Sequence, residues 1–216
     1  MLNRGLLKNT AKQQIRGKIG VLFLITLIAF CVMWLAGFIP FVGTVIINFF
    51  LAPAFSLSLT MIYLKIADGK DVATGDVFDG FYKFWGAFKV TFLVGLFTML
   101  WSLLFVVPGI IKAYSYSMAL YIWAENPQMG ALEAIKKSQE IMEGHKMDYF
   151  VLELSFIGWI LLGAVTFGLA YIYVIPYVSA TDANFYRLLC PAQSAEYVYT
   201  APAEDIPAQE EENNAE

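Results

Sequence analysis

Four runs of apolar residues in this chain are each long enough to cross the hydrocarbon core of a bilayer as an α-helix, which takes about 17 to 25 residues. They lie at about 19–38, 43–65, 88–107 and 168–189. Two shorter runs, at about 109–125 and 149–165, bring the predicted number of spans to six. Each short run also fits a tilted or partly re-entrant helix. Because a bilayer offers no water to backbone polar groups, we predict an all-α, polytopic transmembrane helical bundle of three helical hairpins.

The composition agrees with a membrane protein and separates the chain into two parts. Hydrophobic residues make up 59% and charged residues 15%, which is too apolar for an ordinary soluble domain. Residues 191–216 hold seven carboxylates and no Lys or Arg. We therefore predict an integral membrane domain at 1–190 and an acidic, disordered cytoplasmic tail at 191–216. About 18 polar and basic residues precede the first span, so we expect this span to stay as an anchor rather than be cleaved as a signal peptide.

The basic residues fall on one side of the predicted spans. The opposite connections, near "GFIPFVG", "VVPGI" and "AVTFG", carry no charge. Lys and Arg in short loops favour the cytoplasmic side. We therefore predict a multi-pass protein of the cell membrane with cytoplasmic N- and C-termini. The basic residues on the cytoplasmic side are Arg4, Lys8, Lys12, Arg16, Lys18, Lys65, Lys70, Lys83, Lys89, Lys136, Lys137, Lys146 and Arg187.

Three cytoplasmic segments mix polar and apolar residues, and each precedes a span: "LLKNTAKQQIRGK", "GDVFDGFYKFWGAFK" and residues 126–144. The third is predicted to be an amphipathic helix that begins at Asn126 and ends near Gly144, on the inner membrane face. These segments suggest three repeats of surface helix, span, tight turn and span. The alternative is chance similarity between ordinary transmembrane segments.

Two returning helices share a spacing that supports the repeat. Pro53, Ser56 and Tyr63 are spaced like Pro176, Ser179 and Tyr186. Because proline removes a backbone donor, both prolines are predicted to kink their helices.

Lys112 is the one basic residue predicted to lie inside the membrane near the outer side, four residues after Pro108. In one interpretation its long side chain snorkels to the outer interface. In the other, Lys112 joins Ser115 and Tyr116, three and four residues further along the helix, to bind a phospholipid phosphate or a small anionic solute. The second interpretation rests on the absence of any carboxylate on the predicted outer side.

Glu153 and Asp182 are the carboxylates predicted to lie within spans, both toward the inner ends of their helices. Charges in lipid are costly, so both are candidate functional residues. They can instead be structural or interfacial, with Lys146 or Arg187 neutralising Glu153. If the two carboxylates face each other, a shared proton would suit proton-coupled transport or acid–base chemistry.

Sequence motifs for catalysis and metal binding are missing. The chain has two cysteines and one histidine, and no pattern of a nucleophile elbow, phosphate loop or zinc site. We expect no cofactor, no catalytic residue, no metal site and no nucleic-acid partner.

The leading hypothesis is a non-enzymatic membrane protein that binds lipid or a small solute, acting as a transporter-like or membrane-organising component. The alternatives are an intramembrane lipid-modifying enzyme using Glu153 or Asp182, and an accessory subunit of a complex with other membrane proteins. The oligomeric state stays open.

Three stretches resemble a known family: "PGIIKAYSYSMALYIWAENP", "ALEAIKKSQEIMEGHKMDYFVLELSFIGW" and "PYVSATDANFY". They are similar to an uncharacterised bacterial membrane-protein family, domain of unknown function number 975, found mainly in Firmicutes. The likeness covers the chain to about residue 190. It implies a multi-pass plasma-membrane protein and brings no established activity, substrate or catalytic residue. The acidic tail lies outside the family pattern.

Overall fold

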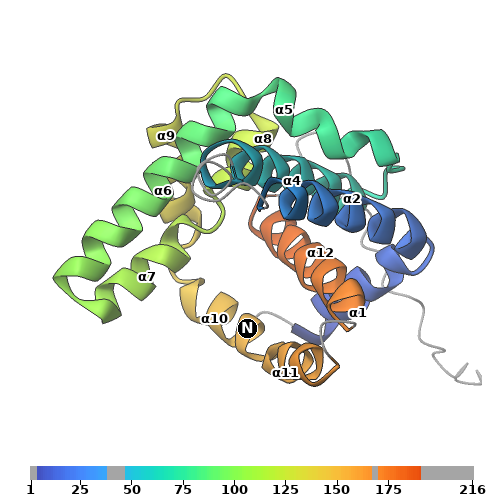
Figure 1. The fold of residues 1–216 in the computed structure, drawn as a ribbon. Helices are drawn as coiled ribbons and strands as arrows, with labels where there is room; N and C mark the ends of the chain where they lie inside the picture. The colour runs from blue at the N-terminus through green and yellow to red at the C-terminus, as the bar shows by residue number, and fades with distance from the viewer. Residues whose placement is uncertain (1–3, 38–46, 167–169, 191–216) are drawn as a thin grey trace, which may run out of the picture.

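The computed structural model describes residues 4–37, 47–166 and 170–190, and these residues form helices with no strand among them (Figure 1). The prediction of an all-α fold is therefore confirmed. The predicted tail at 191–216 and residues 38–46 and 167–169, which include parts of two predicted outer connections, lie outside the described residues. The elements are α1 (Arg4–Arg16), α2 (Ile19–Gly37), the π-helical turn η1 (Ile47–Leu51), α4 (Ala52–Ala67), the 3-10 turn η2 (Thr74–Phe78), α5 (Asp79–Tyr82), α6 (Phe84–Leu104), α7 (Val106–Tyr116), α8 (Ala119–Glu125), α9 (Ala131–Ile141), α10 (Lys146–Leu154), α11 (Ile157–Val165) and α12 (Tyr171–Leu189).

Two of the described helices are long and apolar enough to cross a membrane by themselves. They cover Phe49–Ala67, which joins η1 to α4, and Phe84–Leu104, which is α6. A third span is possible if Arg4–Arg16 and Ile19–Val32 are taken together, although these two segments meet at 87°. The structure thus supports two or three membrane-spanning helices by length and composition.

The predicted runs 109–125 and 149–165 are each divided into two short helices. The first breaks between α7 and α8, and the second between α10 and α11. At each break a serine hydroxyl donates to a carbonyl three residues earlier: Ser117 to Tyr114 at 2.9 Å, and Ser155 to Leu152. Such local side-chain bonds compete with the regular backbone ladder, which accounts for the two interruptions.

The two prolines and one predicted boundary take different places in the structure. Pro53 lies in the first turn of α4, directly after the π-helical turn, whereas Pro176 lies inside α12. The third amphipathic helix begins at Ala131 rather than at Asn126. Asn126 instead ends α8, and its carbonyl accepts a turn bond from the backbone N–H of Met129 at 2.9 Å.

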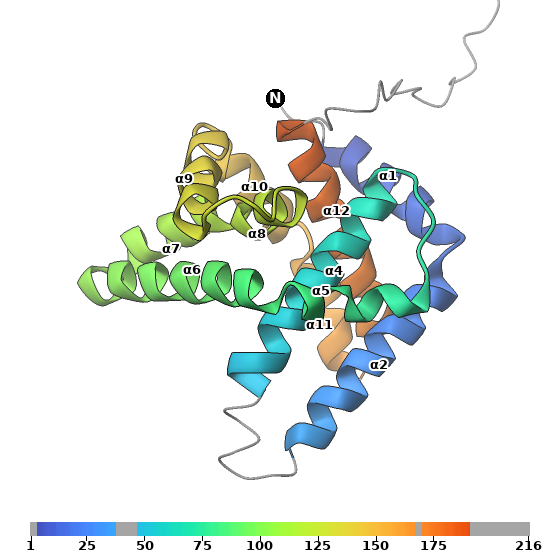
Figure 2. The same cartoon turned by 90° about the horizontal axis from the view of Figure 1, so that it is seen from above.

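The core lies where the amphipathic segments meet the ends of the apolar helices. Helix α12 runs through this region, against α1 and α4 (Figures 1 and 2). Buried residues of α1, α4, α8, α9 and α12 form one continuous cluster. The amphipathic segments therefore build a packed base rather than isolated surface helices.

Apolar side chains become exposed away from this base. Helices α6 and α7 form an antiparallel pair that extends from the rest of the molecule in both views (Figures 1 and 2). At its tip, residues 103–107 are 64–81% exposed although all five are Leu, Phe or Val. Helix α11 likewise exposes Ile157, Ile160 and Leu161. Exposed apolar surface of this extent is typical of helices that face lipid.

A charge network joins the C-terminal ends of three helices at the base. The Arg187 guanidinium near the end of α12 contacts Asp68 through two nitrogens, at 2.6 and 2.8 Å. A third nitrogen of Arg187 donates to Glu125 at the end of α8, and the Tyr186 hydroxyl donates to the same carboxylate at 2.5 Å. Because Asp68 directly follows α4, one guanidinium links the C-terminal ends of α4, α8 and α12.

Candidate functional site

A polar cluster lies on one face of α12, centred on Asp182. The Oδ1 atom of this carboxylate is buried and has no hydrogen-bond partner among the described residues. Tyr149 of α10 and Tyr121 of α8 lie beside it. Tyr63 of α4 neighbours Tyr121 and Ser179, and its buried hydroxyl also lacks a hydrogen-bond partner in the described part of the chain. The cluster thus draws side chains from four helices.

Glu153 of α10 belongs to the same region. It accepts a hydrogen bond of 2.8 Å from the Tyr114 hydroxyl of α7. It also lies near enough to Asp182 for the two charges to repel each other. The structure therefore brings the two predicted intramembrane carboxylates into one cluster.

Neither carboxylate forms an ion pair with a Lys or Arg within the described residues. Arg187, considered above as a partner of Glu153, is engaged by Asp68 and Glu125. Asn184, a sequence neighbour of Asp182, donates instead to Gln14 of α1 at 2.7 Å. Such an arrangement can hold a shared proton or a bound cation. Among the described residues, no group of three His, Cys, Asp or Glu side chains could hold a metal ion.

Lys112 forms no ion pair with either acid within the described residues. Its Nζ is 5.1 Å from the ring centre of Trp101 on the paired helix α6, a cation–π contact. Tyr116 is buried and also lies beside Trp101. Ser115 is fully buried, and its hydroxyl donates to the Ile111 carbonyl at 2.9 Å. The three predicted site residues therefore share a helix end, but the Ser115 hydroxyl is used within its own helix.

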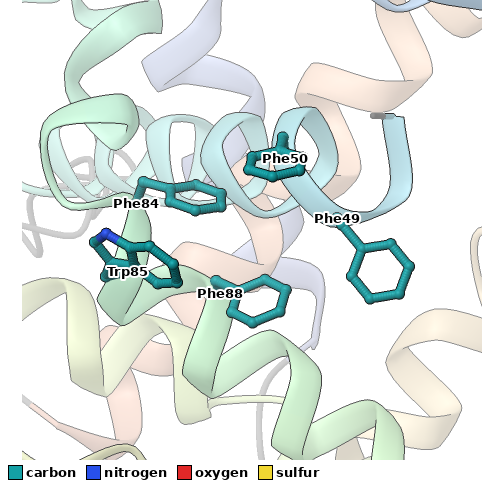
Figure 3. Close-up of a pocket in the computed structure, with 5 residues that line it drawn as sticks. All are labelled: Phe49, Phe50, Phe84, Trp85 and Phe88. Carbon is teal, nitrogen blue, oxygen red and sulfur yellow. The ribbon is translucent and has the colours of Figure 1, made fainter. Parts of the chain in front are cut away.

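An aromatic groove lies between η1 and the start of α6, with a volume of about 300 Å³ (Figure 3). Phe50 stacks on Phe84 with ring centres 5.5 Å apart, and Phe84 stacks on Phe88 at 5.8 Å. Figure 3 shows the rings of the two segments facing a common space. The groove is lined by Phe49, Phe50, Phe84, Trp85 and Phe88.

The groove is not predictable from the sequence alone. Phe84 and Phe88 are one helical turn apart, which places them on one face of α6. Phe49 and Phe50 lie in an earlier predicted span, and nothing in their spacing indicates that they meet α6. The sequence feature that could have indicated the groove is the enrichment in aromatic residues at the start of α6.

Two lysines flank the groove on α6. Lys83 directly precedes the helix and Lys89 follows Phe88. Within the described residues neither forms an ion pair. The start of α6 therefore combines an apolar groove with basic side chains.

These features define an all-α protein that carries helices able to cross a membrane. The chain matches the model of a family described as "Protein of unknown function (DUF975)" over residues 1–115 and 103–193, and it belongs to this family. The family resemblance seen in the sequence is thereby confirmed. Comparisons with curated proteins and with solved structures gave no match.

Proposed function

We propose that this chain is a non-enzymatic, multi-pass protein of the cell membrane that binds an anionic phospholipid between its first two helix pairs. In this proposal six segments cross or enter the membrane as three hairpins, and both termini are cytoplasmic. The exposed apolar tip of α6 and α7 lies in lipid, and the packed base lies at the cytoplasmic face. The one-sided distribution of Lys and Arg supports this orientation.

The observation that carries the proposal is the aromatic groove. Its five lining side chains are all aromatic, and the segments on both sides can span a membrane. Such a groove opens toward acyl chains rather than water. Aromatic rings supply many dispersion contacts to an alkyl chain, which compensates for the lack of a hydrophobic driving force inside lipid.

Basic residues supply the preference for an anionic headgroup. Lys83 and Lys89 lie next to the groove residues at the start of α6, where their charges can bind a lipid phosphate. Tyr82 and Trp85 at this end are 88% and 70% exposed, as expected for aromatic residues at a membrane interface. In the same proposal Lys112 contacts a phosphate at the outer face. A small anionic solute there is the alternative ligand.

A lipid-modifying enzyme is a weaker alternative for this geometry. Glu153 is hydrogen-bonded to Tyr114, and Asp182 lies among Tyr121 and Tyr149. Neither carboxylate lies beside the aromatic groove that would hold an acyl chain, because the groove is built by other residues. We therefore assign the carboxylates no role in lipid chemistry.

Phospholipid cross-linking tests the groove. A photoactivatable anionic phospholipid with the reactive group on its acyl chain is added to the full-length protein in nanodiscs. In the Trp85→Ala/Phe88→Ala double variant we expect cross-linking to residues 49–50 and 84–92 to fall about tenfold, because loss of about 1.4 kcal/mol of ring contacts corresponds to that factor. The control Phe30→Ala, an exposed phenylalanine of α2, should leave this cross-linking unchanged. Equal cross-linking in wild type and double variant would contradict the proposal.

A further inference from the structure

We propose that the polar cluster around Asp182 is a binding site for a monovalent metal cation such as sodium. This site is separate from the lipid groove and does not depend on the proposed lipid binding. It rests on two buried oxygen atoms that lack hydrogen-bond partners among the described residues: Asp182 Oδ1 and Tyr63 Oη. Tyr63 lies on α4, which packs against α12, and Tyr121 is near both residues, so the two residues belong to one cluster.

Buried polar atoms without partners are costly, because they have lost water and gained nothing in return. The described part of the chain leaves three such side-chain atoms, and two of them belong to residues of this cluster. The third belongs to His145, whose ring nitrogen lies 3.7 Å from the Asp148 carboxylate. A cation bound between Asp182 and Tyr63 would satisfy both oxygens at once.

The polar side chains of this cluster all carry oxygen atoms. Asp182 and Ser179 lie one turn apart on α12, and Tyr63 of α4 neighbours Ser179. Tyr149 of α10 and Tyr121 of α8 complete the surroundings. Hard cations prefer oxygen ligands, and a divalent ion usually takes more carboxylates than this cluster offers. The donor set therefore suits a monovalent ion.

The charges around the cluster also favour a cation. Glu153 adds a second carboxylate in the last turn of α10, where the helix dipole is negative. Lys8 of α1 donates to the Ser155 carbonyl at 3.3 Å and lies over the Phe156 ring at 4.2 Å, while Arg187 of α12 is held by Asp68 and Glu125. These two basic side chains thus have other partners.

The interrupted helices beside the cluster strengthen this assignment. The Tyr114 hydroxyl near the end of α7 donates to Glu153 near the end of α10. This hydrogen bond joins the two helices that end at the breaks before α8 and α11. Broken helices inside a membrane are tolerated where their ends are buried in protein or line a cavity, and their C-terminal ends coordinate cations in several transport proteins.

Thermal unfolding of the full-length protein in nanodiscs tests this site. Sodium chloride is compared with choline chloride at equal ionic strength and constant pH. We expect sodium to raise the Tm of the wild type by about 2–4 °C, the shift that corresponds to selective binding of the native state. Asp182→Asn should abolish this rise and unfold in choline at or above the wild-type temperature. The control Asp76→Asn, in the η2 turn, should keep the full sodium response.

A second variant keeps the test decisive if Asp182→Asn does not fold. Tyr63→Phe removes one oxygen and keeps the ring, and it should raise the sodium concentration for half-maximal stabilisation about tenfold. Equal Tm values of the wild type in sodium and choline would overturn the proposal. A Tm that changes with pH and not with sodium would also overturn it and identify a proton as the occupant.

Discussion

Replacing Arg187 by methionine is expected to lower the free energy of unfolding by about 3–5 kcal/mol, the typical cost of removing one partner from a buried ion pair. The Arg187 side chain is 13% exposed and that of Asp68 is 7% exposed, so solvent screens this interaction little. The variant leaves two carboxylates, Asp68 and Glu125, without the guanidinium that joins α4, α8 and α12. Thermal unfolding and denaturant titration in detergent measure the loss.

Two further variants distinguish the effect of the hydrogen-bonded network on stability from the effect of charge alone. Arg187→Lys keeps the charge but cannot bind Asp68 through two nitrogens while also reaching Glu125, so its stability should lie between those of wild type and Arg187→Met. Lys70→Met removes an exposed partner of the same carboxylate, and we expect a change of at most about 1 kcal/mol. If Lys70→Met and Arg187→Met cost the same, the network does not hold the base together.

Gly86→Ala is expected to destabilise the protein, although alanine is the better helix former. A Cβ atom at Gly86 would lie 1.8 Å from Cζ2 of the Trp123 ring in α8. Trp123 is buried, and its indole N–H donates to the Met129 carbonyl at 3.1 Å, so the ring cannot move away without losing that bond. Forcing extra atoms into a packed core costs about 1–3 kcal/mol, which exceeds the gain of about 1 kcal/mol in helix propensity.

The same helix provides the matched control. Gly95 lies in α6 with no atom within 4 Å of an added Cβ. Gly95→Ala should therefore raise the free energy of unfolding by up to about 1 kcal/mol. Thermal unfolding of the two variants in the same detergent compares them directly. Stabilisation of both by a similar amount would mean that α6 and α8 do not pack as described.

The sequence predicted those features that depend on local composition. Long apolar runs fold as helices because no other local structure satisfies the backbone in an apolar setting, and the all-α fold follows. The breaks at 117–118 and 155–156 were missed, since a serine in an apolar run is equally compatible with an unbroken helix. Whether its hydroxyl competes with the backbone depends on the surrounding packing.

Contacts between distant segments were the least predictable. Arg187 was assigned to the cytoplasmic side, yet its partner Asp68 is 119 residues away and Glu125 is 62 residues away. In the aromatic groove, Phe50 likewise contacts Phe84, which belongs to a different segment of the chain. Asp182 and Glu153 were identified because a carboxylate in an apolar run is conspicuous, whereas the tyrosines around them resemble ordinary transmembrane composition.

Membrane topology tests the central claim that three hairpins enter the membrane from a cytoplasmic base. Cys31 and Cys190 are first replaced by serine, and single cysteines are then placed at 41, 107 and 167 near the predicted outer turns. Further single cysteines are placed at 75, 136 and 205, in the predicted cytoplasmic segments. Intact cells are treated with a membrane-impermeant thiol reagent. We predict labelling at 41, 107 and 167 in intact cells, and at 75, 136 and 205 only after permeabilisation. Labelling at 136 in intact cells would contradict the account.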